Sequence, residues 1–352
     1  MRSVKHWIFN KWTLGFLSSL IFAYVITNIF MDSLDSHEYD PKLGKVIYTS
    51  NTYYRIRREG WATTYIGKYN TIGTKDIDKN KLPKIAIWGD SEVTAFPLPD
   101  EKKMGQQVSE MFSRAGRRCI GFGIAHSDNN LADYIVDLRK YESLIPNIIA
   151  HYIVLSNLND DTLPLQNLNT DRSKFIYDGN FRIIESDGRR RHQKIYYLLS
   201  KYNLRVVSYF FGQVSRYRVQ FPWSLHQERA KSNKSAESLY DKLEAWEFIL
   251  DELRKKSNNP ITFLYCPYRP AIIGENVSFE DPQREDKIIF ADFCRKHNIG
   301  FIDLTDRFND FFLKTKEFPR GFANSFPGRG HININGHRIV AEAIFLNELT
   351  RN

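Results

Sequence analysis

Cysteine is scarce in this sequence: its 352 residues include only Cys119, Cys266 and Cys294. Three cysteines cannot build a disulfide framework, although one pair among them stays open. Each stands in an apolar strand or helix pattern, so we interpret them as buried free thiols. No internal repeat or low-complexity tract occurs, which argues against solenoid and fibrous architectures.

Metal and nucleic-acid sites find no support in the sequence. His331 and His337 lack a third ligand at a convincing spacing, so we predict no metal and no cofactor. No nucleic-acid-binding motif is present, and we expect no nucleic-acid partner. The formal net charge is +9, and about +8 of it lies after residue 35, a balance that favours acidic or anionic partners.

The chain has a single long hydrophobic run, near its amino terminus. Thr13 to Met31 carries no charge, and it follows Arg2, Lys5 and Lys11. About twenty apolar residues span a bilayer, and a basic flank stays in the cytoplasm. We therefore interpret residues 1–35 as a cytoplasmic tail and a transmembrane signal anchor in the cytoplasmic membrane, with the rest of the protein extracytoplasmic (periplasmic). A cleaved signal peptide is the alternative, but residues 26–31 offer no small-x-small cleavage site.

The remaining chain divides into a linker with accessory strands at 36–82 and a larger domain at 83–352. Apolar strand patterns alternate with helical ones in the domain, which predicts right-handed parallel crossovers. The expected fold is α/β, a three-layer αβα arrangement around a five-stranded parallel sheet. The predicted strands are 84–88, 118–123, 148–155, 261–266 and 299–304.

An insertion at about 161–234 interrupts this alternation. Residues 174–184 contain Asp178 and Gly179 between short apolar runs, which predicts a β-hairpin. Residues 194–218 are aromatic and basic with rough helical spacing, which indicates a helical hairpin. An insertion of this size at the end of a strand is well placed to cover a pocket or to face a membrane or a partner.

Polar residues follow the first three predicted strands at their carboxyl ends. The first strand stops at Gly89-Asp90-Ser91 and a helix follows, which is the geometry of an exposed nucleophile. Gly123 and Asn159 come at the ends of the second and third strands, and His331 lies in the loop before the last helix. Open parallel sheets bind their ligands at this edge, so we expect these four residues to lie close together there.

Serine, glycine, asparagine and histidine in this order resemble the signature of the SGNH (GDSL-type) hydrolases and acyltransferases, over about residues 83–349. The segment His331-Ile332-Asn333-Ile334-Asn335-Gly336-His337 resembles the closing motif of that family. The resemblance implies a flavodoxin-like SGNH fold. It also implies that Ser91 is a nucleophile and that His331 is its general base.

The resemblance further assigns an oxyanion hole to the Ser91 and Gly123 backbone N–H groups and the Asn159 side-chain amide. Asp90, Asn333 and His337 are interpreted as supporting residues, with His337 packed near the site.

Two positions depart from the family pattern. Family members usually carry an aspartate three residues before the catalytic histidine, and here that position is Gly328. A backbone carbonyl could orient the His331 ring in a Ser-His dyad, and Asp303 or Asp306 are weaker candidates for the missing acid. Asn157 stands where the family has a glycine.

The sequence therefore predicts a membrane-anchored esterase or O-acyltransferase that forms an acyl-enzyme at Ser91. The resemblance and the anchor point to an acetylated cell-envelope or secreted polysaccharide as substrate. A transferase would need an acyl donor delivered across the membrane by a partner. The alternative is a non-catalytic SGNH-like scaffold that binds glycan or assembly partners, a reading that Gly328 motivates. Fold alone does not decide between them.

Overall fold

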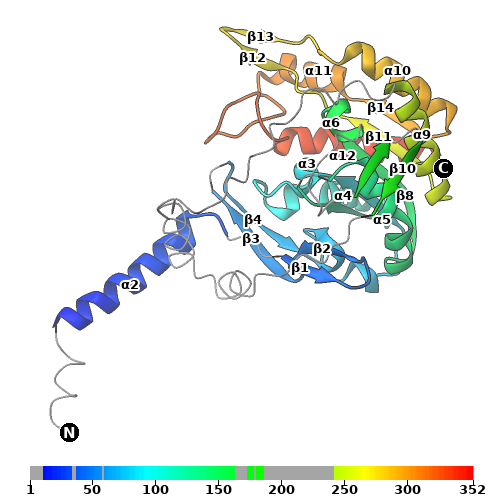
Figure 1. Cartoon of the computed structure of the whole chain (residues 1–352). Helices are drawn as coiled ribbons and strands as arrows, with labels where there is room; N and C mark the ends of the chain where they lie inside the picture. Colours follow the sequence, from blue (N-terminus) through cyan, green and yellow to red (C-terminus); the bar gives the residue numbers. More distant parts are fainter. Residues whose placement is uncertain are drawn as a thin grey trace, which may run out of the picture.

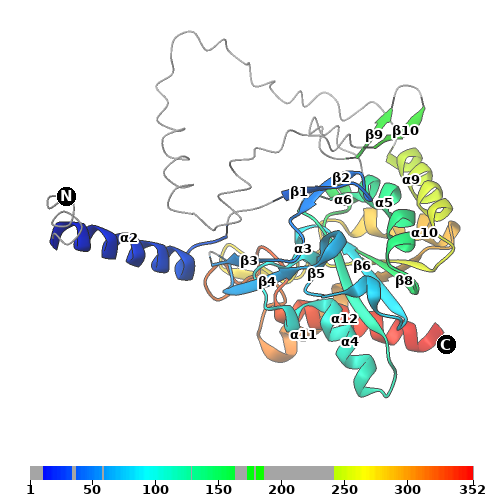
Figure 2. The ribbon, with the colours of Figure 1, turned by 90° about the horizontal axis from the view of Figure 1, so that it is seen from below.

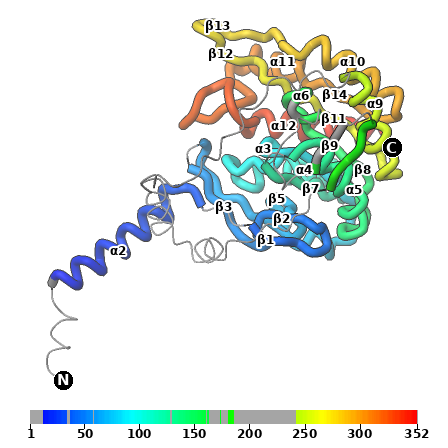
Figure 3. Tube along the Cα trace, viewed as in Figure 1, coloured from blue at the N-terminus to red at the C-terminus, as the bar shows by residue number. Residues whose placement is uncertain are grey.

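The computed structural model describes residues 11–33, 37–57, 59–127, 129–162, 173–177, 180–185 and 242–351. Helix α2 (Lys11–Phe30) extends away from an α/β body (Figure 1). The carboxyl end of helix α12 (Ile334–Arg351) lies on the opposite side of that body (Figure 3).

The body is built around a sheet with five parallel strands. These are β6 (Lys84–Gly89), β7 (Ile120–Ala125), β8 (Ile148–Leu155), β11 (Ile261–Tyr265) and β14 (Gly300–Asp303). Their spatial order is β14, β11, β8, β6, β7, which is the flavodoxin-like order when the five are counted along the chain. The predicted parallel sheet and its topology are confirmed.

Within the described part of the chain the sheet has eight strands, so the prediction of five was incomplete. A meander of β3 (Thr52–Ile56), β4 (Ala62–Ile66) and β5 (Thr71–Ile72) continues it, with β5 antiparallel to β7. The five parallel strands would leave the outer edge of β7 unpaired, and an unpaired edge exposes backbone N–H and C=O groups. Three of the accessory strands of residues 36–82, β3, β4 and β5, therefore belong to the main sheet, whereas β1 and β2 pair only with each other.

Helices cover both faces of the sheet and complete the three-layer arrangement (Figure 2). One face carries α4 (Met104–Arg114), α11 (Thr305–Thr315) and α12, and the other carries α5 (Leu131–Leu144), α9 (Lys242–Lys256) and α10 (Arg284–Lys296). The side chains of β6 alternate between the two cores. Ile85 and Ile87 join one, and Ala86 and Trp88 join the other.

Smaller elements lie around this sandwich. The two short helices at the carboxyl edge of the sheet are α3 (Ser91–Thr94) and α6 (Leu158–Thr162). The three additional hairpins are β1 (His37–Asp40) with β2 (Lys45–Tyr48), β9 (Lys174–Tyr177) with β10 (Phe181–Ile184), and β12 (Ala271–Ile273) with β13 (Asn276–Ser278). The single-turn 3₁₀ helices are Lys68–Asn70, Ile77–Lys79 and Asp100–Lys102.

The insertion is described only in part. The β9–β10 hairpin confirms the prediction for residues 174–184. The helical hairpin expected at 194–218 lies outside the described residues.

Helix α2 agrees with the predicted hydrophobic segment. Its stretch Trp12–Phe30, nineteen residues long, is long and apolar enough to cross a membrane, and none of its most apolar window is buried against the rest of the described structure. A signal sequence has the same length and composition, so the membrane topology stays a prediction.

The turn from β6 into α3 is unusually tight. A Cβ atom on Gly89 would lie 2.3 Å from Cγ2 of Val93 and 3.0 Å from its Cβ. Val93 is buried in the core beneath the turn. Glycine at position 89 therefore allows α3 to fold back onto the end of β6, and this brings Ser91 to the edge of the sheet.

We expect Gly89→Ala to lower the free energy of unfolding by about 1–3 kcal/mol, because the added methyl group overpacks the site against Val93. Val93→Ala in the same chain makes room and should recover part of that loss. Denaturant unfolding of the full chain in detergent measures both. A Gly89→Ala protein as stable as the wild type would contradict the close packing of this turn.

Candidate active site

Ser91 is the first residue of α3, directly after β6. The Asp90 side chain caps the helix, since its Oδ1 accepts a hydrogen bond of 2.9 Å from the Glu92 backbone N–H. The Ser91 side chain is half-buried. N–H groups in the first turn of a helix have no partner within the helix, so the Ser91 N–H is a potential donor to a ligand.

His331 lies in the loop between α11 and α12. The loop closes on itself, because the Gly321 N–H donates to the His331 carbonyl at 2.9 Å and Arg320 forms a β-bridge with Ile332. The Ile332 N–H donates to Oε2 of Glu92 at 2.7 Å. The residue after Ser91 and the residue after His331 are thus in direct contact.

The described part of the chain contains no hydrogen bond between Ser91 and His331 themselves. Electrostatic interactions nevertheless link the His331 ring to Asp90 and Glu92, which flank Ser91. The two predicted catalytic residues are therefore held on neighbouring segments at one edge of the sheet.

A carboxylate orients the His331 ring, and it comes from Glu59. Glu59 Oε2 lies 2.6 Å from His331 Nδ1, and Oε1 accepts from the His331 backbone N–H at 3.2 Å. The Glu59 contact, with further contributions from Glu92 and Asp90, raises the pKa of His331 above its ordinary value of 6.5. A carboxylate on Nδ1 leaves Nε2 available for a substrate or a nucleophile.

Glu59 corrects the expectation of a backbone carbonyl or of Asp303 or Asp306. Asp303 is engaged elsewhere, with Lys287 at 2.8 Å and with the Thr305 side chain at 2.6 Å. Asp306 lies in the first turn of α11. Glu59 was not predicted as a site residue, because it falls in the segment interpreted as linker and accessory strands, 272 residues before its partner.

Position 328, where the family pattern has an aspartate, does not accommodate a side chain in this loop. Its φ is +73°, a left-handed conformation that favours glycine. A Cβ atom there would lie 2.8 Å from the Phe318 ring. The loop therefore turns sharply at residue 328, and the acid reaches His331 from a different part of the chain.

Arg320 ties the loops of the site together. Its side chain is 1% exposed, and its guanidinium makes five hydrogen bonds across the carboxyl ends of three strands and the histidine loop. The acceptors are Glu92 Oε1 (2.5 Å), Ser156 Oγ (2.8 Å), the Cys266 carbonyl (2.8 Å), the Pro267 carbonyl (2.7 Å) and the Gly330 carbonyl (3.1 Å). The ring of Tyr268 lies against the guanidinium at 4.3 Å.

Further acidic groups crowd this edge of the sheet. Burial and the neighbouring Glu92 raise the pKa of Asp90 to about 6. Burial and the charge of Asp90 raise the pKa of Asp161, whose Oδ2 accepts from the Ser156 and Asn157 N–H groups at 2.7 and 2.8 Å. The charges of His331 and Arg320 act in the opposite direction and lower the pKa of Asp90.

The two other predicted oxyanion residues, Asn159 and Gly123, differ in how they agree with the prediction. Asn159 is exposed in the first turn of α6, after β8, as expected for the strand-end position. Gly123 was expected at the end of its strand, but β7 continues to Ala125. Gly123 pairs with Ile87 of β6 and Ile72 of β5, so its backbone lies within the sheet. The strand extends further than predicted because β6 and β5 pair with it on both sides.

Asn333 and His337 support the site from behind. The Asn333 amide donates to the Phe318 and Gly321 carbonyls at 2.7 and 2.9 Å, and its Oδ1 accepts from the Asn335 N–H at 2.9 Å at the start of α12. His337 is fully buried, and its Nδ1 accepts from the Met104 N–H at 3.0 Å. His337 therefore joins α12 to α4, and burial holds its pKa well below 6.5.

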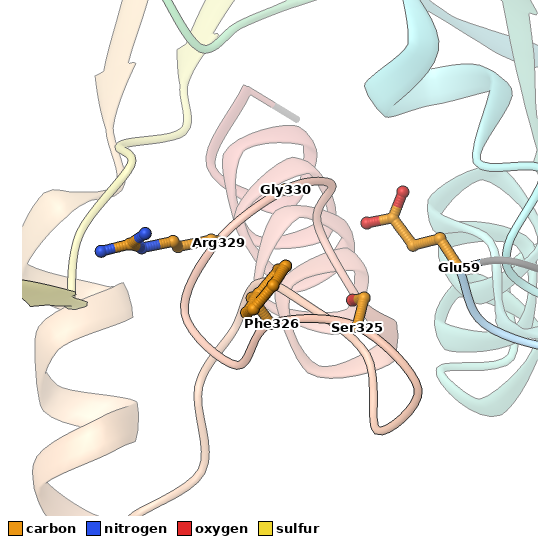
Figure 4. A pocket seen from close by; sticks show the side chains of 5 residues that line it. All are labelled: Glu59, Ser325, Phe326, Arg329 and Gly330. Atoms are coloured by element: carbon orange, nitrogen blue, oxygen red, sulfur yellow. The ribbon is translucent and has the colours of Figure 1, made fainter.

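A cavity of about 320 Å³ opens beside the histidine. It is lined by Glu59, Ser325, Phe326, Arg329 and Gly330 (Figure 4). Glu59 and Arg329 stand at opposite ends of the cavity, and Phe326 lies between them with 77% of its surface exposed. The site thus combines half-buried catalytic candidates with an accessible aromatic and basic surface.

Comparisons with known proteins identify similar structures but no relative in sequence. No family model matches the chain, and no curated protein matches it. The lipase/acylhydrolase from Enterococcus faecalis shows 13% identity and a TM-score of 0.40, covering 77% of this chain and 97% of that one.

Two further structures are similar to a comparable extent. A member of the lipolytic G-D-S-L family from Veillonella parvula gives 12% identity, coverages of 76% of this chain and 99% of that one, and a TM-score of 0.37. A variant of the acetyl xylan esterase Axe2 from Geobacillus stearothermophilus gives 18% identity, coverages of 77% of this chain and 97% of that one, and a TM-score of 0.36.

The Arg320–Glu92 pair predicts a large stability effect. Glu92→Gln leaves the Arg320 charge buried without its partner, and we expect the free energy of unfolding to fall by about 3–5 kcal/mol. Glu110→Gln, which breaks the exposed pair with Arg114, is the matched control and should change it by at most about 1 kcal/mol. Equal effects of the two changes in denaturant unfolding would show that the buried pair is not a structural hub.

The Glu59 contact predicts an elevated pKa for His331. The carboxylate stabilises the protonated ring, so the ring stays charged to a higher pH than an ordinary histidine. Glu59→Gln should therefore lower the pKa of His331, measured by NMR titration of the ring with His331→Asn to assign the signal. Glu317→Gln, another glutamate that hydrogen-bonds in the same region, should leave that pKa unchanged. An unshifted pKa in Glu59→Gln would refute the pairing.

Proposed function

We propose that the protein is an acyl-ester hydrolase or O-acyltransferase that forms an acyl-enzyme at Ser91. The observation that carries the proposal is the Glu59 carboxylate on His331 Nδ1, beside a serine on a strand-to-helix turn. A hydroxyl attacks an acyl carbon poorly unless a base accepts its proton. Acid, histidine and serine at one edge of a sheet form a set able to do so.

In the acylation step, His331 Nε2 accepts the Ser91 Oγ proton as Oγ bonds to the carbonyl carbon of the ester. Glu59 stabilises the imidazolium that results. The tetrahedral intermediate collapses by breaking the bond to the leaving oxygen, which takes the proton from His331. Water or a second hydroxyl then repeats the sequence on the acyl-enzyme, and this choice separates a hydrolase from a transferase.

Charge develops on the carbonyl oxygen during both steps. The Ser91 N–H at the start of α3 and the Asn159 amide are the proposed donors to that oxyanion, and each such donor contributes on the order of 10²–10³ in rate. The Gly123 backbone N–H, which the resemblance also implies, is the third proposed donor, and its backbone pairs with β6 and β5 within the sheet.

An acylated carbohydrate is the proposed substrate, with acetyl as the acyl group. The motif resemblance, the hydrophobic α2 segment and the basic charge support a polysaccharide of the cell envelope. The exposed Phe326 ring beside Arg329 adds a surface that suits a sugar. The scaffold hypothesis rested on the missing acid at Gly328, and Glu59 removes that reason.

A fluorophosphonate probe tests the proposed function. The wild type should label, and Ser91→Ala should not, because the probe reacts with an activated serine. Ser113→Ala, an exposed serine on α4, is the matched control and should label normally. We expect His331→Asn to slow labelling by about 10²–10⁴-fold through loss of the base.

Absence of labelling in a folded wild-type protein would overturn the proposal and favour a binding scaffold. Where labelling succeeds, release of acetate compared with acetyl transfer to a second glycan then separates a hydrolase from a transferase.

A further inference from the structure

The described residues between β3 and β4, Arg57 and 59–61, form a turn that lies between two parts of the protein that are distant in sequence. On one side it contacts the end of helix α2, and on the other it contacts the histidine loop (Figure 1). Glu59 sits at its centre. The position of this carboxylate therefore depends on what holds the turn.

Helix α2 and the residues directly after it, Asp32 and Ser33, hold the turn through backbone and side-chain groups; these residues are together called the end of α2 below. The Arg57 N–H donates to Asp32 Oδ1 at 2.6 Å, and Arg57 Nε donates to the Ile29 carbonyl at 3.0 Å. Ser33 continues the attachment along the outer edge of β3, since its N–H donates to the Arg55 carbonyl at 2.7 Å and its Oγ accepts from the Arg55 N–H at 2.9 Å.

Aromatic and cationic packing strengthens the same junction. The Trp61 ring meets Phe30, the last residue of α2, with the two ring centres 6.0 Å apart. The Arg57 guanidinium lies over the Trp61 ring at 4.6 Å, and its Nη1 donates to the Ala62 carbonyl at 2.6 Å. Arg57 thus spans the junction, with one nitrogen on α2 and another on the first residue of β4.

The opposite side of the turn is fixed to the histidine loop. Asn324 donates to the Arg57 and Gly60 carbonyls at 2.9 and 2.8 Å, and its Oδ1 accepts from the Gly60 N–H at 2.7 Å. These three bonds flank the contact between Glu59 and His331. A shift of the turn would therefore move the carboxylate relative to the ring.

We propose that the end of α2 is a structural part of the candidate active site, and that Arg57 is a positioning residue that holds Glu59 against His331. The proposal deepens the proposed function, since it makes the membrane segment a support of the acid-histidine pair. It gives α2 a second role besides anchoring. It also explains why the accessory strands continue the main sheet, because they carry the acid to the histidine.

Two variants of the full chain in detergent or nanodiscs loosen the junction from opposite sides. Arg57→Ala removes the hydrogen bond between the Arg57 side chain and α2. Asp32→Ala removes the acceptor of the Arg57 N–H and leaves the amino-acid sequence of the turn unchanged. Arg114→Ala, an exposed arginine in an ion pair on α4, is the matched control. Arg57→Lys retains a charge and should restore part of the wild-type behaviour.

The first readout is the pKa of His331, which does not require activity. Among the described residues, the groups that raise the pKa of His331 are Glu59 from the turn and Asp90 and Glu92 from the β6–α3 segment, and His337 of α12 also interacts electrostatically with the ring. Loss of the Glu59 contact leaves Asp90 and Glu92 in place. Arg57→Ala and Asp32→Ala should therefore lower this pKa in the same direction as Glu59→Gln, whereas Arg114→Ala should not.

The second readout is the rate of ester cleavage or fluorophosphonate labelling. A displaced acid should reduce kcat/KM by up to about 10²-fold, with the loss in kcat. In the Glu59→Gln background, Arg57→Ala should have little further effect, because coupled residues are not additive.

Full additivity of the two changes, or an unchanged pKa of His331 in both junction variants, would overturn the proposal. An inactive wild type with the expected pKa shifts would refute the proposed function and leave the positioning role standing.

Discussion

The buried ion pair between Arg320 and Glu92 is the interaction on which the candidate site depends. Two charges taken out of water are stabilising only when they are paired and fully hydrogen-bonded, and this pair meets that condition. Glu92 Oε2 binds the backbone beside His331, while Arg320 binds the ends of β8 and β11. Loops from four parts of the chain are thereby fixed around Ser91.

A second constraint comes from outside the parallel sheet. The β3–β4 turn supplies Glu59 to His331, and the same turn is attached to the end of α2. The acid of the site is thus provided by an extension of the sheet that is itself bound to the hydrophobic amino-terminal helix. The histidine loop has no carboxylate at Gly328, and Glu59 supplies the carboxylate to His331 instead.

The sequence predicted the features that have local causes. Apolar strands alternating with helices give the five parallel strands, and Gly89-Asp90-Ser91 gives the serine at the strand-to-helix turn. Glu59 could not be found in this way, because nothing in the pattern near residue 59 refers to a histidine 272 residues later. Nothing in the sequence around Arg320 and Glu92 distinguishes them from other polar residues. The prediction that Gly123 ends its strand was wrong, because β7 pairs with a strand on each side and continues to Ala125.

We propose that the His331 ring and the Ser91 hydroxyl act together in catalysis. An experimental structure of the full chain after reaction with a phosphonate ester measures their relative position. We expect a phosphorus bonded to Ser91 Oγ, with His331 Nε2 about 2.6–3.2 Å from an oxygen of the adduct and Glu59 on Nδ1. A modified Ser91 with the His331 ring turned away, or an adduct on another residue, would contradict it.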